Sequence, residues 1–440
     1  MSNIAVEQRS DYVFETISIE SDRLEKPIEI KGLVSDVEIF EHLDKPYLTG
    51  SLVFLDDADI IQNVDILGAE KIQISLRSTR PGAATIDKTF YIDSIAKQTK
   101  ANDNSKIASL NLIEDIGYIS MLFNINRSYS GKCSNLIKSI SSNFLGKTVD
   151  VSDTDKQSFK VIIPNLDPLD SMKWISNRAS TNDGYPFYLF STLVEKNLKF
   201  TDLGTMLQNE VINPDISYKK SNMIQKATSR DVRRRTIKNF TFNSSENLST
   251  LIYHGLVGSK YQYIDTTKNK TNDFSFDIIK DLLKPISGKG VLKTGQKQYT
   301  FSEDYKHAGV SFNKYKSRTI SQIGGSSAFK DAEDVLSFNE SVNVADYKLD
   351  IICRAMDGIL KKTPLTITVP GVDFIDGESH CTVGNNLRIE FPSTTPESKE
   401  NKGIDTKSSG DYLIFAARHM FKKEAYDLTL ECVKMANYDT

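Results

Sequence analysis

Cysteine is scarce in this sequence of 440 residues, and its four cysteines stand far apart. No two of them form a CxxC pair, so the spacing supports neither a zinc ribbon nor a redox motif. The density is also too low for a disulfide scaffold. We therefore expect four buried free thiols, at Cys133, Cys353, Cys381 and Cys432.

Long hydrophobic runs are also absent. No stretch reaches the length of about 18 apolar residues that indicates a transmembrane helix, and residues 1–20 lack the apolar core of a signal peptide. Neither sign of charge dominates, because 55 Lys and Arg oppose 58 Asp and Glu for a net charge of -3. We expect neither a membrane nor a specific nucleic acid as a partner.

Side chains in the spacing of a catalytic or metal site are lacking too. No HExxH occurs, Asp153 and Asp155 lack the Gly and Glu of a calcium loop, and residues 324–327 match neither a phosphate-binding loop nor a nucleophile elbow. We predict no catalytic, cofactor-binding or metal-binding residues, and no cofactor. The five histidines are isolated from one another: His42, His254, His307, His380 and His419.

What the sequence does contain is period-2 alternation of apolar and polar residues, which predicts strands with one buried face. The composition, 39% hydrophobic and 26% charged, is that of a globular protein of about three domains. Between residues 12 and 115 we expect five or six short strands forming a small antiparallel barrel or sandwich. Their apolar positions are Ile28, Ile30, Val37, Ile39, Leu48, Leu52, Phe54, Ile72, Ile74, Leu76, Phe90, Ile92, Ala108, Leu110 and Leu112.

Helical spacing begins after residue 116. A helix over 134–145 has Ser134 as its N-cap, and a second begins at Pro168 after the capping residue Asp167. We expect Trp174 of this second helix to lie in the core. Strands are predicted near residue 159, at 185–190 and at 197–202, which makes this a mixed α+β unit.

Periodicity is weak over residues 221–343. Arg233, Arg234 and Arg235 could meet an acidic partner or phosphates, but a solvated linker is favoured because no aromatic residues interleave with them. A helix is predicted from Phe276 to Pro285. The end of the chain has a predicted helix over 345–360 and strands at 365–369, 387–391, 412–414 and 428–432. A polar loop at 392–410 is expected to be flexible.

The two β-rich ends resemble each other. Gly68 and the strand with Ile72 match Gly384 and the strand with Leu387, while Phe90 matches Tyr412. The final strands then align Leu110 with Leu428. As a pattern alone, this leaves open both an internal repeat and a coincidence between two antiparallel barrels.

Two stretches resemble a known family. Residues 162–203 contain a Pro-x-x-x-Pro turn, a helix with Trp174, an aromatic strand and a second strand. Residues 347–392 and 411–434 contain a helix, a strand ending in Val-Pro-Gly, and a Tyr-led hairpin. The order of these parts resembles the baseplate hub proteins of contractile-tailed bacteriophages, a family shared with the spike proteins of contractile injection systems. The resemblance covers about half of the chain well, and residues 265–335 match nothing.

The resemblance implies a mainly β protein with α+β parts, in which two similar antiparallel β-barrel tube domains flank smaller mixed α/β domains. It implies a structural, non-enzymatic homotrimer that joins the sixfold tail tube to a trimeric spike around a channel for DNA. Other baseplate proteins would contact its periphery, and the protein would be assembled in the host cytoplasm into the virion tail.

The expected division of the chain is a first tube domain at 1–116 and a mixed domain at 117–220. A linker and insertion, which can contribute strands to the second barrel, occupies 221–343, and a helix with the second tube domain occupies 344–440. Two rival functions remain open. One is a phage-carried cell-wall or polysaccharide hydrolase, for which no carboxylate pair stands out. The other is a receptor-binding tail component.

Overall fold

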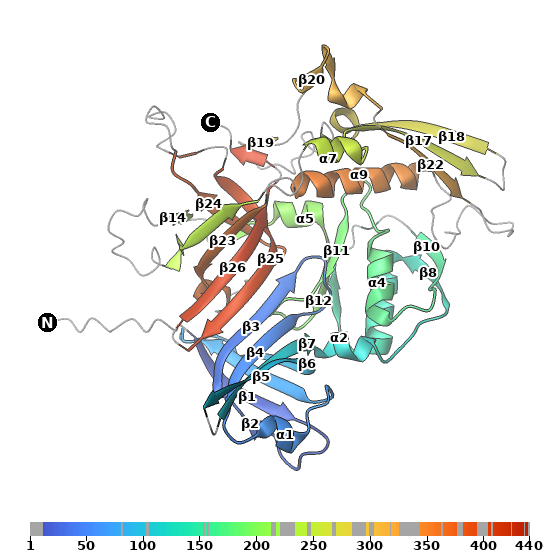
Figure 1. Cartoon of the computed structure of the whole chain (residues 1–440). Helices are drawn as coiled ribbons and strands as arrows, with labels where there is room; N and C mark the ends of the chain where they lie inside the picture. Colours follow the sequence, from blue (N-terminus) through green and yellow to red (C-terminus); the bar gives the residue numbers. More distant parts are fainter. Residues whose placement is uncertain are drawn as a thin grey trace.

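The chain is mainly β, which confirms the predicted fold class, and the longest described helix lies between the mixed region and the insertion (Figure 1). Of the described strands, fifteen form one continuous sheet. The computed structural model describes residues 12–80, 82–102, 105–152, 155, 158–212, 217–220, 234–243, 248–265, 270–283, 296–298, 303–316, 318–324, 344–361, 364–375, 382–393, 404–405, 408–423, 425–434 and 436–438.

Residues 12–114 form an antiparallel unit, called here the N-terminal β module. Its inward-facing residues alternate with polar ones as predicted, and they enclose one hydrophobic core. The strands are not five or six short ones, however, because β6 alone runs for 17 residues. The module contains β1 (Tyr12–Glu20), β2 (Ile28–Glu29), β3 (Val34–His42), β4 (Thr49–Asp56), α1 (Ile60–Val64), β5 (Lys71–Ser78), β6 (Ile86–Asn102) and β7 (Ser105–Glu114).

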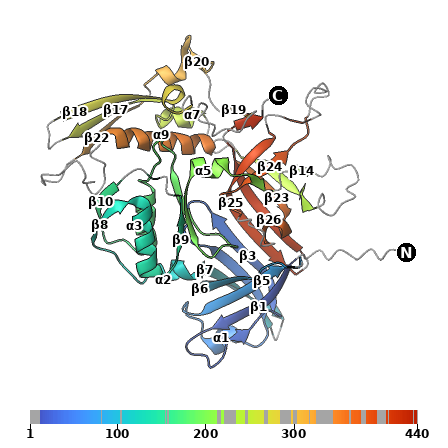
Figure 2. The same cartoon turned by 180° about the vertical axis from the view of Figure 1, so that it is seen from behind.

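The mixed unit follows β7 and packs beside this module (Figure 2). Asp167 caps α4 through the backbone N–H of Asp170, and Pro168 is the first helical residue, as predicted. The unit contains α2 (Asp115–Ser120), β8 (Ser128–Lys132), α3 (Cys133–Ile140), the π-helix η1 (Ser141–Leu145), β9 (Val149–Val151), β10 (Ser158–Ile162), α4 (Pro168–Ser176), β11 (Phe187–Phe190), β12 (Leu198–Asp202) and α5 (Leu203–Gln208).

Trp174 is only half-buried, which corrects its prediction as a core residue. It packs at the margin of the core of the mixed unit, and the Arg178 guanidinium lies 3.9 Å from its ring centroid. The buried side of α4 repeats every three or four residues and leaves out Trp174: it contains Leu169, Met172, Ile175 and Ser176.

An insertion crowned by a short hairpin forms the top of the molecule in Figure 1. The helix predicted from Phe276 begins only at Ile278, as a π-helix, because Phe276 lies near the end of a strand in which Phe274 and Phe276 alternate with polar residues. The side chain of Asp277 then accepts hydrogen bonds from the N–H groups of Ile279 and Lys280. Its elements are α7 (Leu248–Tyr253), β17 (Gly258–Asp265), β18 (Lys270–Asp277), the π-helix η3 (Ile278–Leu283), β19 (Gln296–Gln298), β20 (Lys306–His307), β21 (Val310–Ser311), the 3-10 helix η4 (Phe312–Lys314) and β22 (Arg318–Gly324).

Most of the remaining strands form the C-terminal β module, which we define as β13–β16 together with β23–β26, whereas β27 pairs with β19 of the insertion. The predicted helix over 345–360 is confirmed as α9. These elements are β13 (Val211–Ile212), β14 (Tyr218–Lys220), β15 (Thr236–Ile237), β16 (Asn239–Phe242), α9 (Val344–Leu360), β23 (Leu365–Pro370), the 3-10 helix η6 (Val372–Phe374), β24 (Asn386–Glu390), β25 (Gly410–Lys422), β26 (Ala425–Val433) and β27 (Ala436–Tyr438).

The structure corrects some predictions about side chains and loops, confirms others and leaves the rest untested. Arg234 is buried and the Nε of Arg235 lies 3.7 Å from Asp373, so these two residues belong to the fold and not to a solvated linker. Cys133 and Cys432 are buried free thiols, whereas Cys353 is half-buried. Cys381, Asp153, Arg233, residues 325–327 and most of the loop at 392–410 lie outside the described residues. The division at residues 116, 220 and 343 stays a prediction.

Candidate functional site

The two β modules are joined edge to edge by the antiparallel pairing of β3 with β25, here called the seam. The register runs from Ala416 opposite His42 to Lys422 opposite Asp36. Through this pairing the strand order is continuous from β24 of one module to β5 of the other. The seam is therefore an interface between two β units of the same chain.

A buried polar network lies at the centre of the seam. The Nε2 of His419 is 3.0 Å from Oε1 of Glu41, and its Nδ1 is 2.7 Å from the hydroxyl of Tyr426. Glu41 also accepts hydrogen bonds from the hydroxyl of Thr382 and from the backbone N–H of Leu193. Burial alone would raise the pKa of Glu41, but His419 and these hydrogen bonds lower it below its ordinary value.

Glu41 and His419 do not stand out by the spacing of histidines in the sequence, because they lie far apart in the chain. A signal was present: Glu41 continues the inward series Val37 and Ile39, and His419 lies between Ala417 and Phe421 in the same phase. A polar residue at an inward position of an alternating strand indicates a buried hydrogen-bonded group. Both side chains are inaccessible, so the Glu–His–Tyr arrangement has a structural role and exposes no nucleophile.

The loop between β11 and β12 fastens the mixed unit to the N-terminal module. Leu193 enters the core of that module. The ammonium of Lys88 donates hydrogen bonds to the carbonyl oxygens of Thr192 and Glu195 at 2.8 and 2.9 Å, and it lies 3.4 Å from Glu114. Because Lys88 and Glu114 are both buried, each compensates the charge of the other.

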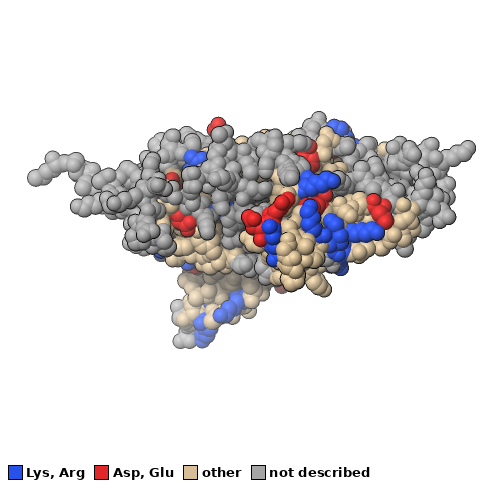
Figure 3. All heavy atoms as spheres, turned by 90° about the horizontal axis from the view of Figure 1, so that it is seen from above, with Lys and Arg blue, Asp and Glu red and all other residues tan. Residues whose placement is uncertain are grey.

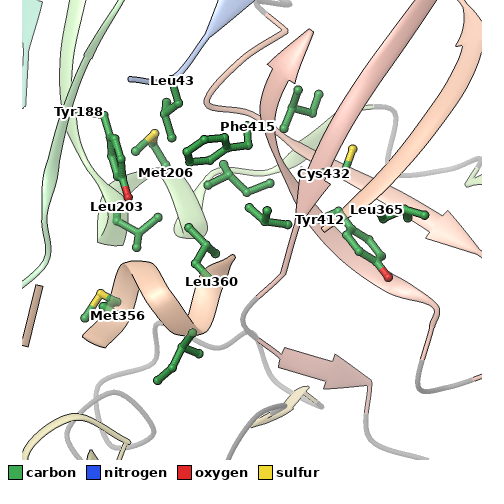
Figure 4. Close-up of a cluster of buried hydrophobic side chains, with 14 of the residues drawn as sticks. Leu43, Tyr188, Leu203, Met206, Met356, Leu360, Leu365, Tyr412, Phe415 and Cys432 are labelled. Carbon is green, nitrogen blue, oxygen red and sulfur yellow. The ribbon is translucent and has the colours of Figure 1, made fainter. Parts of the chain in front are cut away.

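Apolar packing completes the seam on the side of α9. Leu43, which follows β3, leaves its own module and joins the core of the C-terminal module. Figure 4 shows Leu43 with Tyr188, Met206 and Phe415, above Leu360 of α9. The ammonium of Lys361 lies 4.6 Å from the ring centroid of Phe415 and 3.5 Å from Asp44.

The strand registers show that the two modules are built alike. Ile72 pairs with Phe90 between β5 and β6, and Leu387 pairs with Tyr412 between β24 and β25. This is the alignment that the sequence suggested. Both long strands then carry a register shift at the same point, between Ile92 and Ser94 in one and between Ile414 and Ala416 in the other.

The repeat extends over five strands in each module. The order β5–β6–β7–β4–β3 corresponds to β24–β25–β26–β23–β16, and Val37 opposite Leu52 matches Phe240 opposite Ile367. The last part of the sequence alignment is wrong by two residues. Leu110, which pairs with Ile95, corresponds to Leu430, which pairs with Ala417, and not to Leu428.

The repeat leaves one edge on each module without a partner among the described strands. In the seam, β25 and β3 each pair with a strand on either side, whereas their counterparts β6 and β16 have an edge that no described strand pairs with. Residues Ser94–Thr99 of β6 pair only with β7, and β16 pairs only with β23. Phe242 of β16 is 39% exposed, whereas its counterpart Ile39 is fully buried in the seam.

The face of the sheet that points away from the cores is polar, and ion pairs link neighbouring strands on it. Arg418 forms an ion pair with Glu38 across the seam at 2.6 Å, and Lys238 forms one with Asp427. Hydroxyl side chains lie between them on the central strands: Ser51, Ser109, Thr366, Thr368 and Thr429. On a different side of the molecule, the top of Figure 1 seen from above, basic and acidic side chains of described residues likewise lie beside one another (Figure 3).

Within the described residues there is no group of three or more His, Cys, Asp or Glu side chains arranged to hold a metal ion. The described helices also include none that is both long and apolar enough to cross a membrane. The predicted absence of catalytic, cofactor and metal sites stays a prediction.

The fold as a whole is similar to that of a solved tail protein. The chain matches the tail protein from Neisseria meningitidis MC58 with a TM-score of 0.51 at 12% identity, and the match covers 97% of each chain. At this identity the match shows the fold alone. No protein-family model matches the chain, and the comparison with curated proteins gave no match.

Weaker matches include the 43 kDa tail protein of prophage MuSo2 from Shewanella oneidensis, with a TM-score of 0.48 at 12% identity, covering 95% of this chain and 98% of that one. An E. coli component of the type VI secretion system, described as structurally similar to tail proteins of bacteriophage T4, has a TM-score of 0.46 at 8% identity. That match covers 96% of this chain and 79% of the other.

Proposed function

We propose that this protein is the baseplate hub of a contractile phage tail and belongs to the virion. In this role three chains form a ring with pseudo-sixfold symmetry, which joins the sixfold tail tube to a trimeric spike and leaves a central channel for DNA. Other baseplate proteins contact its periphery. The role is structural and not enzymatic. The tube domains are assigned to residues 1–116 and 344–440, with mixed regions at 117–220 and 221–343.

The observation that carries the proposal is the seam together with the two open edges. Within one chain, β25, the counterpart of β6, already pairs with β3, the counterpart of β16. The same pairing between chains would join β6 of one copy to β16 of the next. Open edges of this kind favour association, and a ring closes them all.

The repeat also gives the register of this pairing between copies. His419 lies opposite Ile39 in the seam, and the counterparts of these two residues are Gln98 and Phe242. Gln98 of one copy should therefore lie opposite Phe242 of the next. The exposed Phe242 would then be buried as Ile39 is, which gives the contact an apolar contribution.

The polar outer face of the sheet supports the channel. In a ring closed by these edges, the strands that carry Ser51, Thr368 and Thr429 form a continuous wall. Hydroxyl groups and a mixture of acidic and basic side chains give this wall little net charge, so a polyanion would pass without being held by phosphate contacts.

Cysteine crosslinking tests the register. In the variant Gln98→Cys with Phe242→Cys, mild oxidation should produce a covalent species of three times 49.4 kDa. The matched control is Gln98→Cys with Asn239→Cys, which places the second thiol three residues out of register. Light scattering of the unmodified protein should give the same trimeric mass. A monomer or dimer in solution, or equal crosslinking of both pairs, contradicts the proposed assembly.

A further inference from the structure

The repeat gives the chain strand edges of two kinds, with one edge of each kind on each module. The first kind is formed by β25 and its counterpart β6, and the second by β3 and its counterpart β16. Because the modules are built alike, an edge of the first kind fits either edge of the second kind by its backbone alone. The backbone therefore permits four pairings, of which the seam is one.

Inside the core, the two edges of the seam carry a carboxylate on β3 and an imidazole on β25. Glu41 is 2% exposed and His419 is 0% exposed, and Oε1 of Glu41 lies 3.0 Å from Nε2 of His419. The hydroxyl of Thr382, which precedes β24 in the C-terminal module, also donates a hydrogen bond to Glu41. Two groups that compensate the buried carboxylate of one module thus come from the other module.

The two open edges carry no charge at their described inward positions. On the open stretch of β6 these positions are Ile95 and Gln98, and Gln98 corresponds to His419. On β16 they are Phe240 and Phe242. Gln98 and Phe242 are both exposed in the single chain. The edges of the seam and the open edges therefore differ in chemistry although they share one backbone pattern.

We propose that the Glu41–His419 pair selects which edges join, and so keeps the two modules in alternating order around the ring. This inference rests on the proposed trimer. Pairing β6 of one copy with β3 of another would place Gln98 beside Glu41, and the carboxylate would lose His419 and Thr382. Pairing β25 with β16 would place His419 opposite Phe242 and away from Glu41. Separating a buried pair is strongly unfavourable, so only the seam and the uncharged β6–β16 junction remain.

The wrong pairings would change the size of the assembly. A β6–β3 contact between copies replaces a seam and leaves a β25 edge open. That edge can then capture β16 of a further chain, and the contacts no longer close after three chains. Loss of the selection should therefore produce species heavier than the trimer, which a loss of stability alone would not produce.

Removing both members of the pair tests this role. In the variant Glu41→Gln with His419→Gln, all four pairings bury uncharged side chains, and only the covalent connection between the modules favours the seam. The matched control is Val37→Ala, because Val37 is buried in the same seam opposite Phe421 but carries no charge. Each full-length protein is unfolded in urea, refolded at several protein concentrations, and analysed by size exclusion with light scattering.

We expect the mass fraction heavier than three times 49.4 kDa to rise at least about tenfold in the double variant and to stay at the native level in Val37→Ala. A double variant that refolds to trimers alone overturns the proposal. Equal amounts of heavy species in the control overturn it as well, because a weakened seam would then be sufficient. A native protein that forms no trimer contradicts the proposed function itself, which separates the two failures.

Two further variants keep the test decisive if the double variant does not fold. Gln98→Glu and Gln98→Met change a side chain that is exposed in the single chain, so both should fold. Gln98→Glu should lower the trimer fraction at least about tenfold, because it places a carboxylate without an imidazole in the β6–β16 junction, and Gln98→Met should leave it unchanged. Equal trimer fractions of the two variants would overturn selection by charge.

Discussion

His419 and Glu41 come from opposite sides of the seam and meet at 3.0 Å with both side chains buried. No other titratable pair in the described residues joins β3 to β25 from inside the core. The pair connects the stability of the junction to the protonation of one carboxylate, and it provides the first prediction.

Replacement of Glu41 by Gln should destabilise the protein by roughly 1–3 kcal/mol at pH 7, because the amide cannot accept all the hydrogen bonds that the buried carboxylate accepts. The folded-state pKa of Glu41 is lowered. The contribution of the Glu41 carboxylate to stability is therefore present above the unfolded-state pKa of about 4.3, and it is lost as the pH falls through the folded-state pKa. Urea denaturation of both proteins should show their difference shrinking below about pH 4. A difference that is constant from pH 7 to pH 3 would rule out this linkage.

The contributions of Lys88 and Glu114 to stability should also depend on each other. Lys88→Ala is expected to cost about 3–5 kcal/mol, since it leaves Glu114 buried without its cation. The double variant Lys88→Met with Glu114→Gln should recover part of that loss. The exposed pair Arg77 and Glu15 is the control, and Arg77→Ala should cost less than about 1 kcal/mol. Thermal unfolding of the four proteins checks the order.

Gly50 on β4 should tolerate no side chain. A Cβ there would lie 2.7 Å from the carbonyl oxygen of Glu38 on β3, so Gly50→Ala forces the two strands apart. We expect a loss of about 1–3 kcal/mol, which is usual for overpacking. Gly32→Ala, where no atom lies within 4 Å, should be neutral. Equal melting temperatures of the two variants would contradict the close approach of β3 and β4.

Phe242 should matter for assembly and not for the fold of one chain. Phe242→Asp is expected to convert the trimer to a folded monomer of 49.4 kDa, because it places a charge on the proposed contact edge. Leu55→Asp is the matched control, since Leu55 is also 39% exposed but lies on the central strand β4. Light scattering gives the mass, and circular dichroism confirms folding. A trimeric Phe242→Asp variant would argue against the β6–β16 pairing.

Truncation of a fully buried aromatic residue to Ala costs roughly 3–5 kcal/mol of folding free energy. Trp174→Ala should cost less than this. Trp174 is half-buried and stacks with Arg178, whereas Phe200 in the same unit is fully buried. Phe200→Ala should therefore lower the melting temperature more than Trp174→Ala. The reverse order would show that the Trp174 ring carries more of the core than its exposure indicates.

Local patterns in the sequence were enough for most strands, for the cap of α4 and for α9, since alternation and capping depend on neighbours in the chain. The correspondence of Ile72 with Leu387 and of Phe90 with Tyr412 could also be predicted from matching residues, and the strand registers agree with it. The seam could not, because β3 and β25 are far apart in the chain and no local signal indicates their pairing. The helix predicted from Phe276 depends on apolar residues at 278, 279, 282 and 283, which have helical spacing. In the structure these residues belong to the π-helix η3, while Phe276 lies in the strand before it.

The seam also bears on the order in which such a ring would form. The β3–β25 junction closes within one chain, so its rate is independent of concentration and it can form as soon as the C-terminal strands fold. A junction from β6 to β16 of another chain is a second-order encounter. In a trimer, three junctions would thus be present before any two chains meet. Dilution could separate only the other three, leaving intact two-module arcs that are ready to reassociate.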